Sequence, residues 1–132
     1  MRTRNYISLV LFLAGCGPAV HSATYVPNLP ASKHAGAPVR IYQSTRPACA
    51  FEEIGLVRVR PRSPTHSLDD LLTAMRNRAR AMGGDAIIGL SAAETPDGAV
   101  IVPSASVSVA SISSSPLYTG TVVHFTNPAC TE

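Results

Sequence analysis

Three cysteines carry the most reactive side chains in this chain of 132 residues. A cysteine thiolate is a nucleophile and a metal ligand, and two neighbouring thiols in an oxidising compartment form a disulfide. Cys16 directly follows a short apolar run, whereas Cys49 and Cys130 lie far beyond that run in the sequence. The position of Cys16 therefore indicates chemistry at the N-terminal end, separate from that of the other two cysteines.

The N-terminal residues are typical of a secretory leader. Arg2 and Arg4 are basic, Tyr6 to Ala14 are almost wholly apolar, and a small residue follows. These features describe a signal peptide, and the run is shorter than the roughly 20 residues that a membrane helix needs. The alternatives are an ordinary secreted protein cut near Ala23, which would lose Cys16, and a cytosolic protein with a buried start.

The stretch Leu13-Ala14-Gly15-Cys16 resembles the lipobox of bacterial lipoproteins. In that family the cysteine receives a diacylglyceryl group, the leader is cut before it, and the cysteine becomes the acylated first residue. The resemblance implies a leader over residues 1–15 and a palmitate-type anchor on Cys16 that holds the protein at the membrane. Gly17 rather than aspartate follows, which in such lipoproteins favours the outer membrane, with the domain facing the periplasm.

Cys49 and Cys130 remain as an even pair if Cys16 is lipidated. In an oxidising compartment we predict that they form a disulfide. The closed loop of about 80 residues would stabilise the fold by roughly 4 kcal/mol in the chain-entropy account. Metal ligation and two free thiols are the alternatives.

Spacing gives no evidence of a metal or catalytic site. Neither C-x-x-C nor H-x-x-x-H occurs around the four histidines, so we expect no metal and no cofactor. There is no G-x-S-x-G turn, although spacing alone leaves open a triad built from distant residues. Glu52 and Glu53 are neighbours in a predicted strand and should point to opposite faces. Asp69 and Asp70 lie in the first turn of a predicted helix, where the helix dipole favours negative charge. We therefore expect a protein that is not an enzyme. The histidines are His21, His34, His66 and His124.

The arginines are the remaining candidates for a binding surface. Alternation in a strand and one-turn spacing in a helix would place them on shared faces. Such a surface could meet lipopolysaccharide phosphates, cell-wall carboxylates or an acidic partner, and a solvated polar face is the alternative. The residues are Arg58, Arg60, Arg62, Arg76 and Arg80.

Nucleic acid is not an expected partner. The formal charge of the whole chain is +3, and loss of the two leader arginines would leave a mature chain with almost no net charge. The chain has no tryptophan and only 5% aromatic residues, so it lacks a platform on which bases could stack.

The elements that must position these residues begin after a predicted flexible linker. Residues 16–38 are rich in Pro, Gly, Ala and Ser without periodicity, which predicts the lipidated cysteine followed by a linker. One domain is expected over residues 39–132. A strand is predicted at 39–42, and another at 51–60 with a bulge at Gly55.

One helix is the clearest predicted element. Ser67 is a good N-cap and Gly83 a good terminating residue. Between them an apolar stripe recurs at helical spacing: Leu68, Leu71, Leu72, Met75, Ala79 and Met82.

The remaining predicted elements are strands and loops. Strands are predicted at 85–90, at 99–112 and at 117–125, with a loop at 93–98 and a turn at 113–116. The order β-β-α-β-β-β favours an α+β fold, in which one helix packs on a mostly antiparallel sheet in two layers.

The ordered stretches "CAFEEIG", "MGGDAIIGL" and "TGTVVHF" are similar to small bacterial envelope domains. They resemble a family named for heavy-metal binding and the outer-membrane stress-sensor lipoproteins of the Rcs phosphorelay. The resemblance spans roughly Val39 to Cys130 and implies the same α+β fold. With the leader, it favours a membrane-anchored periplasmic protein that acts as a non-catalytic interaction or envelope-sensing module for an envelope partner. A domain that binds a metal or a small ligand is the alternative.

Overall fold

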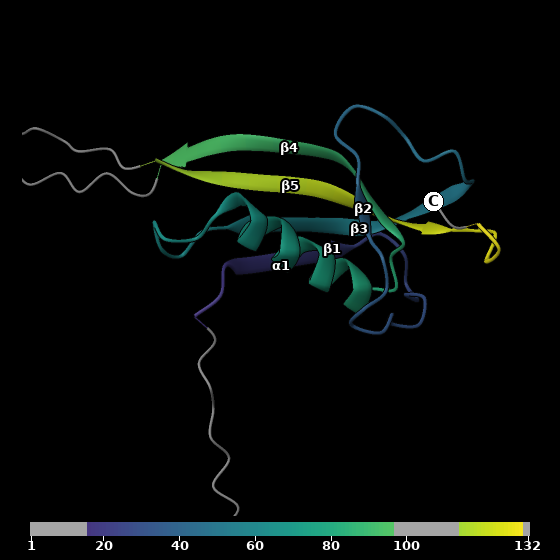
Figure 1. Cartoon of the computed structure of the whole chain (residues 1–132). Coiled ribbons are helices and arrows are strands. Elements are labelled where there is room, and N and C mark those ends of the chain that lie inside the picture. Colours follow the sequence, from purple (N-terminus) through teal and green to yellow (C-terminus); the bar gives the residue numbers. More distant parts are fainter. Residues whose placement is uncertain (1–15, 97–113, 131–132) are drawn as a thin grey trace, which may run out of the picture.

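The computed structural model describes residues 16–96 and 114–130. Its strands form one sheet in the order β1-β3-β5-β4-β2, in which only β2 and β4 are parallel neighbours. The helix lies across one face of this sheet (Figure 1). The predicted α+β fold with one helix on a mostly antiparallel sheet is therefore confirmed. The elements are β1 (Ala19–Thr24), β2 (Arg40–Ile41), β3 (Phe51–Arg60), α1 (Leu68–Ala81), β4 (Ala86–Pro96) and β5 (Ser114–Phe125).

α1 begins and ends at the predicted residues. The Ser67 side chain accepts a hydrogen bond from the Asp70 N–H at 3.2 Å, and the Asp70 carboxylate accepts one from the Ser67 N–H at 2.8 Å. This capping box satisfies amides that the first turn leaves unpaired. The hydrogen bonds that Ser67 donates, first from its backbone and then from its side chain, lower the pKa of Asp70. Gly83, with a φ of 82°, terminates the helix.

The apolar stripe of α1 packs on the middle of the sheet. Its buried members, Leu71, Met75, Ala79 and Met82, are at most 3% exposed. The predicted stripe is too wide at its start, because Leu68 is 51% exposed and Leu72 only half-buried. Leu72 packs against the edge of the core cluster, whereas Leu68 is not part of it. The strand side chains beneath the helix are Ile54, Val57, Val59, Ile87 and Val122.

A second apolar cluster lies on the opposite face of the sheet. Strand alternation turns Val123 away from Val122, so that these neighbours belong to different clusters. Tyr42 and Phe51, both partly buried, pack against the cluster. Further along the same face His21 and Arg58 are exposed. The buried members are Cys49, Ala86, Ile88, Val123 and Phe125.

The predicted linker over residues 16–38 is wrong, because Ala19–Thr24 is an edge strand. It pairs antiparallel with β3 from Ala19↔Arg60 to Thr24↔Gly55. Only Val20 among its six residues is a large apolar residue, so the sequence shows no strand pattern. Backbone hydrogen bonds to β3, which need no particular side chains, hold the strand in place.

Other strand limits also differ from the predictions. The first predicted strand is reduced to the two residues of β2. β4 continues to Pro96, into the loop predicted at 93–98, and β5 begins at Ser114, within the turn predicted at 113–116. Their ladder continues to Pro96↔Ser114, because backbone pairing proceeds where local residue preferences favour turns. The strand predicted at 99–112 lies outside the described residues.

Gly55 forms the predicted bulge. The register of β3 against β5 shifts between Glu53 and Gly55. A Cβ atom at Gly55 would collide with the Met82 side chain and with the carbonyl oxygen of Ala23. Glycine therefore lets β1 and the end of α1 approach β3 closely.

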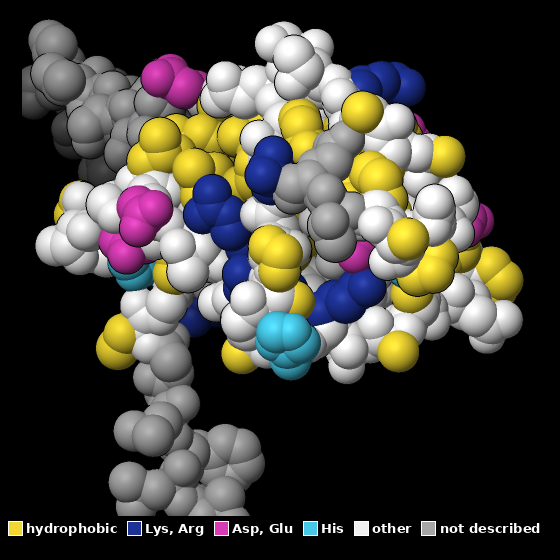
Figure 2. Space-filling model, turned by 45° about the vertical axis from the view of Figure 1, so that its right-hand side comes forward, with side chains coloured by type: hydrophobic (Ala, Val, Ile, Leu, Met, Phe, Trp, Pro, Cys, Tyr) yellow, Lys and Arg dark blue, Asp and Glu magenta, His cyan; other side chains and the backbone are white. Residues whose placement is uncertain are grey.

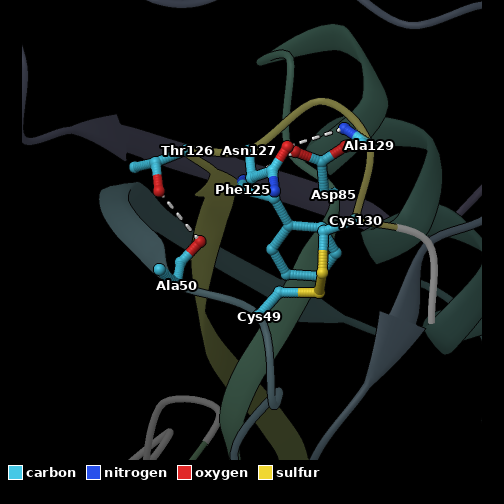
Figure 3. Close-up of a disulfide and its surroundings, with 8 residues drawn as sticks. All are labelled: Cys49, Ala50, Asp85, Phe125, Thr126, Asn127, Ala129 and Cys130. Carbon is cyan, nitrogen blue, oxygen red and sulfur yellow. Dashed lines mark hydrogen bonds between the residues drawn. A yellow bond between two sulfur atoms is a disulfide. The ribbon is translucent and has the colours of Figure 1, made fainter.

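The predicted disulfide between Cys49 and Cys130 is present (Figure 3). Their Cα atoms are 6.1 Å apart, within the usual range of about 4.4–6.8 Å. The antiparallel pairing Phe51↔Phe125 brings the start of β3 beside the end of β5, and with it the two cysteines. The Thr126 N–H also donates to the Ala50 carbonyl at 3.1 Å. We call this region of the molecule, residues 49–51 and 125–130, the disulfide end.

The helix packing predicts different costs for the same substitution at two leucines. Leu71→Ala removes a buried side chain and should lower the free energy of unfolding by about 2–5 kcal/mol. Leu68→Ala, at the exposed leucine one turn earlier, should change it by about 0.5 kcal/mol or less. Urea denaturation of both variants measures the difference, and equal losses would contradict the described helix face.

The capping box predicts a dependence on pH. Because the pKa of Asp70 is lowered in the folded state, its stabilising contribution is complete above the ordinary aspartate pKa of about 4. It is lost as the pH falls through the lower folded value. Asp70→Asn should therefore lower the melting temperature at neutral pH and converge with the wild type in strong acid. Asp69→Asn removes the same charge outside the box, and an equal effect of both variants would argue against this role for the box.

The disulfide predicts a loss of stability on reduction. The double variant Cys49→Ser/Cys130→Ser should be less stable than the oxidised protein by about 2–5 kcal/mol. Reductant should lower the denaturation midpoint of the wild type to a similar extent and leave the double variant unchanged. Two free thiols in the protein isolated under non-reducing conditions would contradict the pairing.

Candidate functional site

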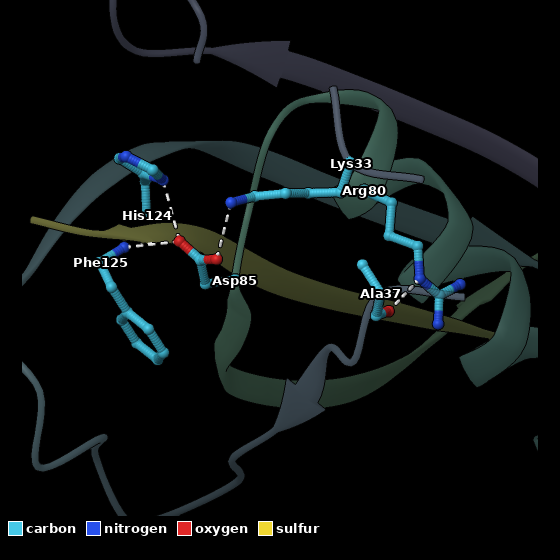
Figure 4. A network of polar contacts seen from close by, with 6 residues as sticks. All are labelled: Lys33, Ala37, Arg80, Asp85, His124 and Phe125. Carbon is cyan, nitrogen blue, oxygen red and sulfur yellow. Dashed lines mark hydrogen bonds and ion pairs between the residues drawn. The ribbon is translucent and has the colours of Figure 1, made fainter. Parts of the chain in front are cut away.

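A cluster of polar groups centres on Asp85, directly before β4 (Figure 4). Its Oδ1 atom lies 3.1 Å from Lys33 Nζ. Its Oδ2 atom accepts a hydrogen bond from the Phe125 N–H at 2.8 Å and lies 2.9 Å from His124 Nδ1. The three charged or titratable side chains are between 21% and 32% exposed, so solvent only partly screens them. One carboxylate thus joins three segments that are distant in sequence.

His124 contacts Asp85 through a buried ring nitrogen. Its Nδ1 atom lies 2.9 Å from Asp85 Oδ2, but no hydrogen bond of good geometry reaches Nδ1. Histidine beside a carboxylate is also an arrangement found in metal and catalytic sites. In residues 16–96 and 114–130, however, no three His, Cys, Asp or Glu side chains converge to hold a metal ion.

A cavity of about 280 Å³ lies beside this cluster. Lys33, His34 and Arg40 supply cationic or titratable groups to its wall, and Tyr42 and Phe125 supply aromatic rings. Asp85 opposes part of this positive charge. The combination suits a small ligand that has an anionic group and an apolar body.

Lys33 and Asp85 were not among the candidate residues predicted from the sequence, and the spacing of His124 indicated no site. No motif spacing connects these three residues, because they come from a loop, the start of a strand and the end of another strand. The available signal was the acidic residue placed directly before the buried strand 86–88. A charge in that position needs a partner, but the partner's identity depends on the fold.

The predicted surface of five arginines is not a single surface. Val57 and Val59 face α1, so Arg58 and Arg60 project from the opposite face of the sheet. Arg76 and Arg80 lie on the helix, and the Arg80 guanidinium donates to Asn77 Oδ1 at 2.6 Å. The strand and helix sets are therefore separated by the thickness of the molecule, and Arg62 lies in the loop that joins β3 to α1.

The charged side chains on the face with the helix are dispersed. Figure 2 shows Lys and Arg side chains interrupted by hydrophobic and uncharged groups. Arg78 on α1 donates to Ser22 Oγ on β1 at 2.8 Å, which ties the helix to the edge strand. Within the predicted set, the bond from Arg80 to Asn77 likewise favours a structural role for Arg80.

Cys16 is exposed, takes no part in the disulfide and lines a broad groove. The groove has a volume of about 680 Å³ and lies between the residues before β1 and one side of α1. Val20 and Ala74 give it apolar surface, and His66 and Arg78 give it polar surface. The predicted lipidation residue therefore lies at the surface beside the first strand.

Within the parts of the chain that the structure describes, no helix has the length and hydrophobicity needed to cross a membrane.

Comparisons with known proteins give no family. No protein-family profile matches the chain, and no curated protein matches it. Among solved structures the chain is similar to the crystal structure of the Francisella virulence factor FvfA in the orthorhombic form. The TM-score is 0.48 and the sequence identity 14%, over 80% of this chain and 97% of that chain.

Proposed function

We propose that this protein is a lipid-anchored lipoprotein of the bacterial outer membrane, with its domain in the periplasm. Residues 1–15 act as the leader, and Cys16 becomes the acylated N-terminus. The α+β domain serves as a non-catalytic interaction or envelope-sensing module. The lipid on Cys16 attaches the protein to the membrane, and the domain binds a protein of the cell envelope.

The observation that carries this proposal is that two of the three cysteines form a disulfide, whereas the third is exposed outside it. Cys49 and Cys130 are joined in the disulfide, which is typical of proteins in oxidising compartments. Cys16 is exposed outside that pair, directly after a leader that ends in Leu13-Ala14-Gly15. An exposed thiol at this junction is accessible to acylation and cleavage, and Gly17 after it favours the outer membrane.

A binding role agrees with the state of the polar groups. The Asp70 carboxylate is engaged in the capping box, and the Asp85 carboxylate is engaged with Lys33, His124 and the Phe125 amide. A general base needs a lone pair that faces the substrate proton. Both oxygens of Asp85 and the Oδ2 atom of Asp70 instead contact groups of the protein itself, which favours a structural role for them and a binding role for the domain.

The anchor is tested by the substitution Cys16→Ser in the full chain, produced in a bacterial host. The wild type should partition into detergent, and its intact mass should correspond to residues 16–132 plus a diacylglyceryl group and an acyl chain. Cys16→Ser should lack the lipid mass and accumulate as the uncleaved precursor, because the acceptor thiol is gone.

The control is the double variant Cys49→Ser/Cys130→Ser, which removes the same functional group elsewhere. It should lose the disulfide and keep the lipid. A wild-type protein without lipid that stays in the aqueous phase would refute the anchor, and so would a lipidated Cys16→Ser protein.

A further inference from the structure

Cys16 is joined to the folded domain without a spacer. Only Gly17 and Pro18 separate it from β1, whose first residue Ala19 pairs with Arg60. At about 3.3 Å per residue, no more than about 10 Å of chain connects Cys16 to this strand. A lipid on Cys16 would therefore hold the sheet directly beside the bilayer.

A histidine also ties the backbone of Cys16 to the domain. The Nε2 atom of His66 lies 2.9 Å from the carbonyl oxygen of Cys16, and a carbonyl only accepts hydrogen bonds, so Nε2 donates. On the other side of the ring, Nδ1 accepts a hydrogen bond from the Arg62 N–H at 3.2 Å. The two contacts are compatible in one neutral tautomer, which bridges Cys16 and the loop before α1.

These contacts define one end of the molecule, residues 16–19 and 60–68, which we call the proximal end. Figure 1 shows the start of β1 (purple) and the C-terminal end of the described chain at opposite ends of the sheet. Arg62 is exposed at the proximal end, and Leu68 is an exposed large apolar residue there, at 51%. Of the two acidic residues that follow, Asp70 directs its carboxylate at Ser67.

We propose that the proximal end is a membrane-contacting surface that rests on phospholipid headgroups. Arg62 lies against lipid phosphates, and Leu68 enters the apolar part of the interface. Guanidinium groups form paired hydrogen bonds with phosphate, and exposed apolar side chains partition into this layer. This inference rests on the proposed lipid on Cys16.

The short connection selects a lipid surface over a protein partner at this end. A protein layer between domain and bilayer would need at least the roughly 10 Å diameter of one helix. The chain between Cys16 and Ala19 is no longer than that even when fully extended, and the hydrogen bond from His66 to the Cys16 carbonyl shortens it. Headgroups are therefore the surface within reach of Arg62 and Leu68.

The test uses fluorescence from a single tryptophan, because the chain has none of its own. Leu68→Trp places the probe at the proximal end. Leu29→Trp is the matched control, since Leu29 is 39% exposed and precedes Pro30, whose carbonyl oxygen adjoins Gly83 beyond the last turn of α1. The 14 residues of α1 separate the two positions by about 20 Å. Thr65→Trp supplies a second probe at the proximal end if Leu68→Trp fails to fold.

Each lipidated full chain is reconstituted in vesicles of phosphatidylethanolamine and phosphatidylglycerol whose acyl chains are brominated near the headgroup. Bromine quenches tryptophan on contact, so emission from Leu68→Trp should fall about twofold relative to unbrominated vesicles, as for a side chain in the interface. Emission from Leu29→Trp should not change.

Adding Arg62→Gln to the Leu68→Trp chain should reduce the quenching in these vesicles. The reduction should be smaller in vesicles of phosphatidylcholine alone, which keep the phosphate but lack the net negative charge. Adding Arg40→Gln to the Leu68→Trp chain instead removes the same charge near the disulfide end and should not change the quenching. If the intact mass shows the lipid but the two leucine probes are quenched equally or not at all, the membrane-contacting surface is refuted and the anchor stands. A mass without lipid refutes both.

Discussion

The rest of the structure depends on the antiparallel pairing of β3 with β5. These two strands are the centre of the sheet, with β1 added outside β3 and β4 outside β5. They supply Val57 and Val122 to the cluster beneath α1, and Phe125 to the cluster on the opposite face. The paired residues are about 60–75 positions apart in sequence, so their pairing must offset a large loop-closure entropy. The disulfide between Cys49 and Cys130 closes the same loop and reduces the entropy of the unfolded chain.

The parts of this structure that could be predicted are those with a local signature. α1 has a cap, an apolar period and a terminating glycine, and β3 has alternation with a glycine bulge, so their limits agree closely with the sequence. β1 has small and polar residues held by backbone pairing, and such a strand has no pattern of its own. The cluster of Lys33, Asp85 and His124 was equally inaccessible, because its members become neighbours only when a loop, β4 and β5 are assembled.

The difference between a linker and β1 changes the expected behaviour of the whole molecule. A flexible linker of the predicted length would have let the domain move freely at some distance from the bilayer. With β1 in the sheet and the Cys16 carbonyl bonded to His66, a lipid on Cys16 would fix one end of the sheet toward the membrane. Orientation, which a linker would leave undetermined, would then follow from the strand direction of β1.

The direction of the strands also places the disulfide and the Asp85 cluster at the end of the domain opposite Cys16. β3 and β5 run antiparallel, so the disulfide and the Asp85 cluster lie where β3 starts and β5 ends. Lys33 attaches the segment before β2 to Asp85, and the Lys33 N–H donates to the Arg80 carbonyl at the end of α1. Covalent and ionic ties thus hold three loops in fixed positions around the cavity lined by Arg40 and Tyr42. Loops fixed in this way lose little conformational entropy on binding, so this cavity is preorganised by the fold.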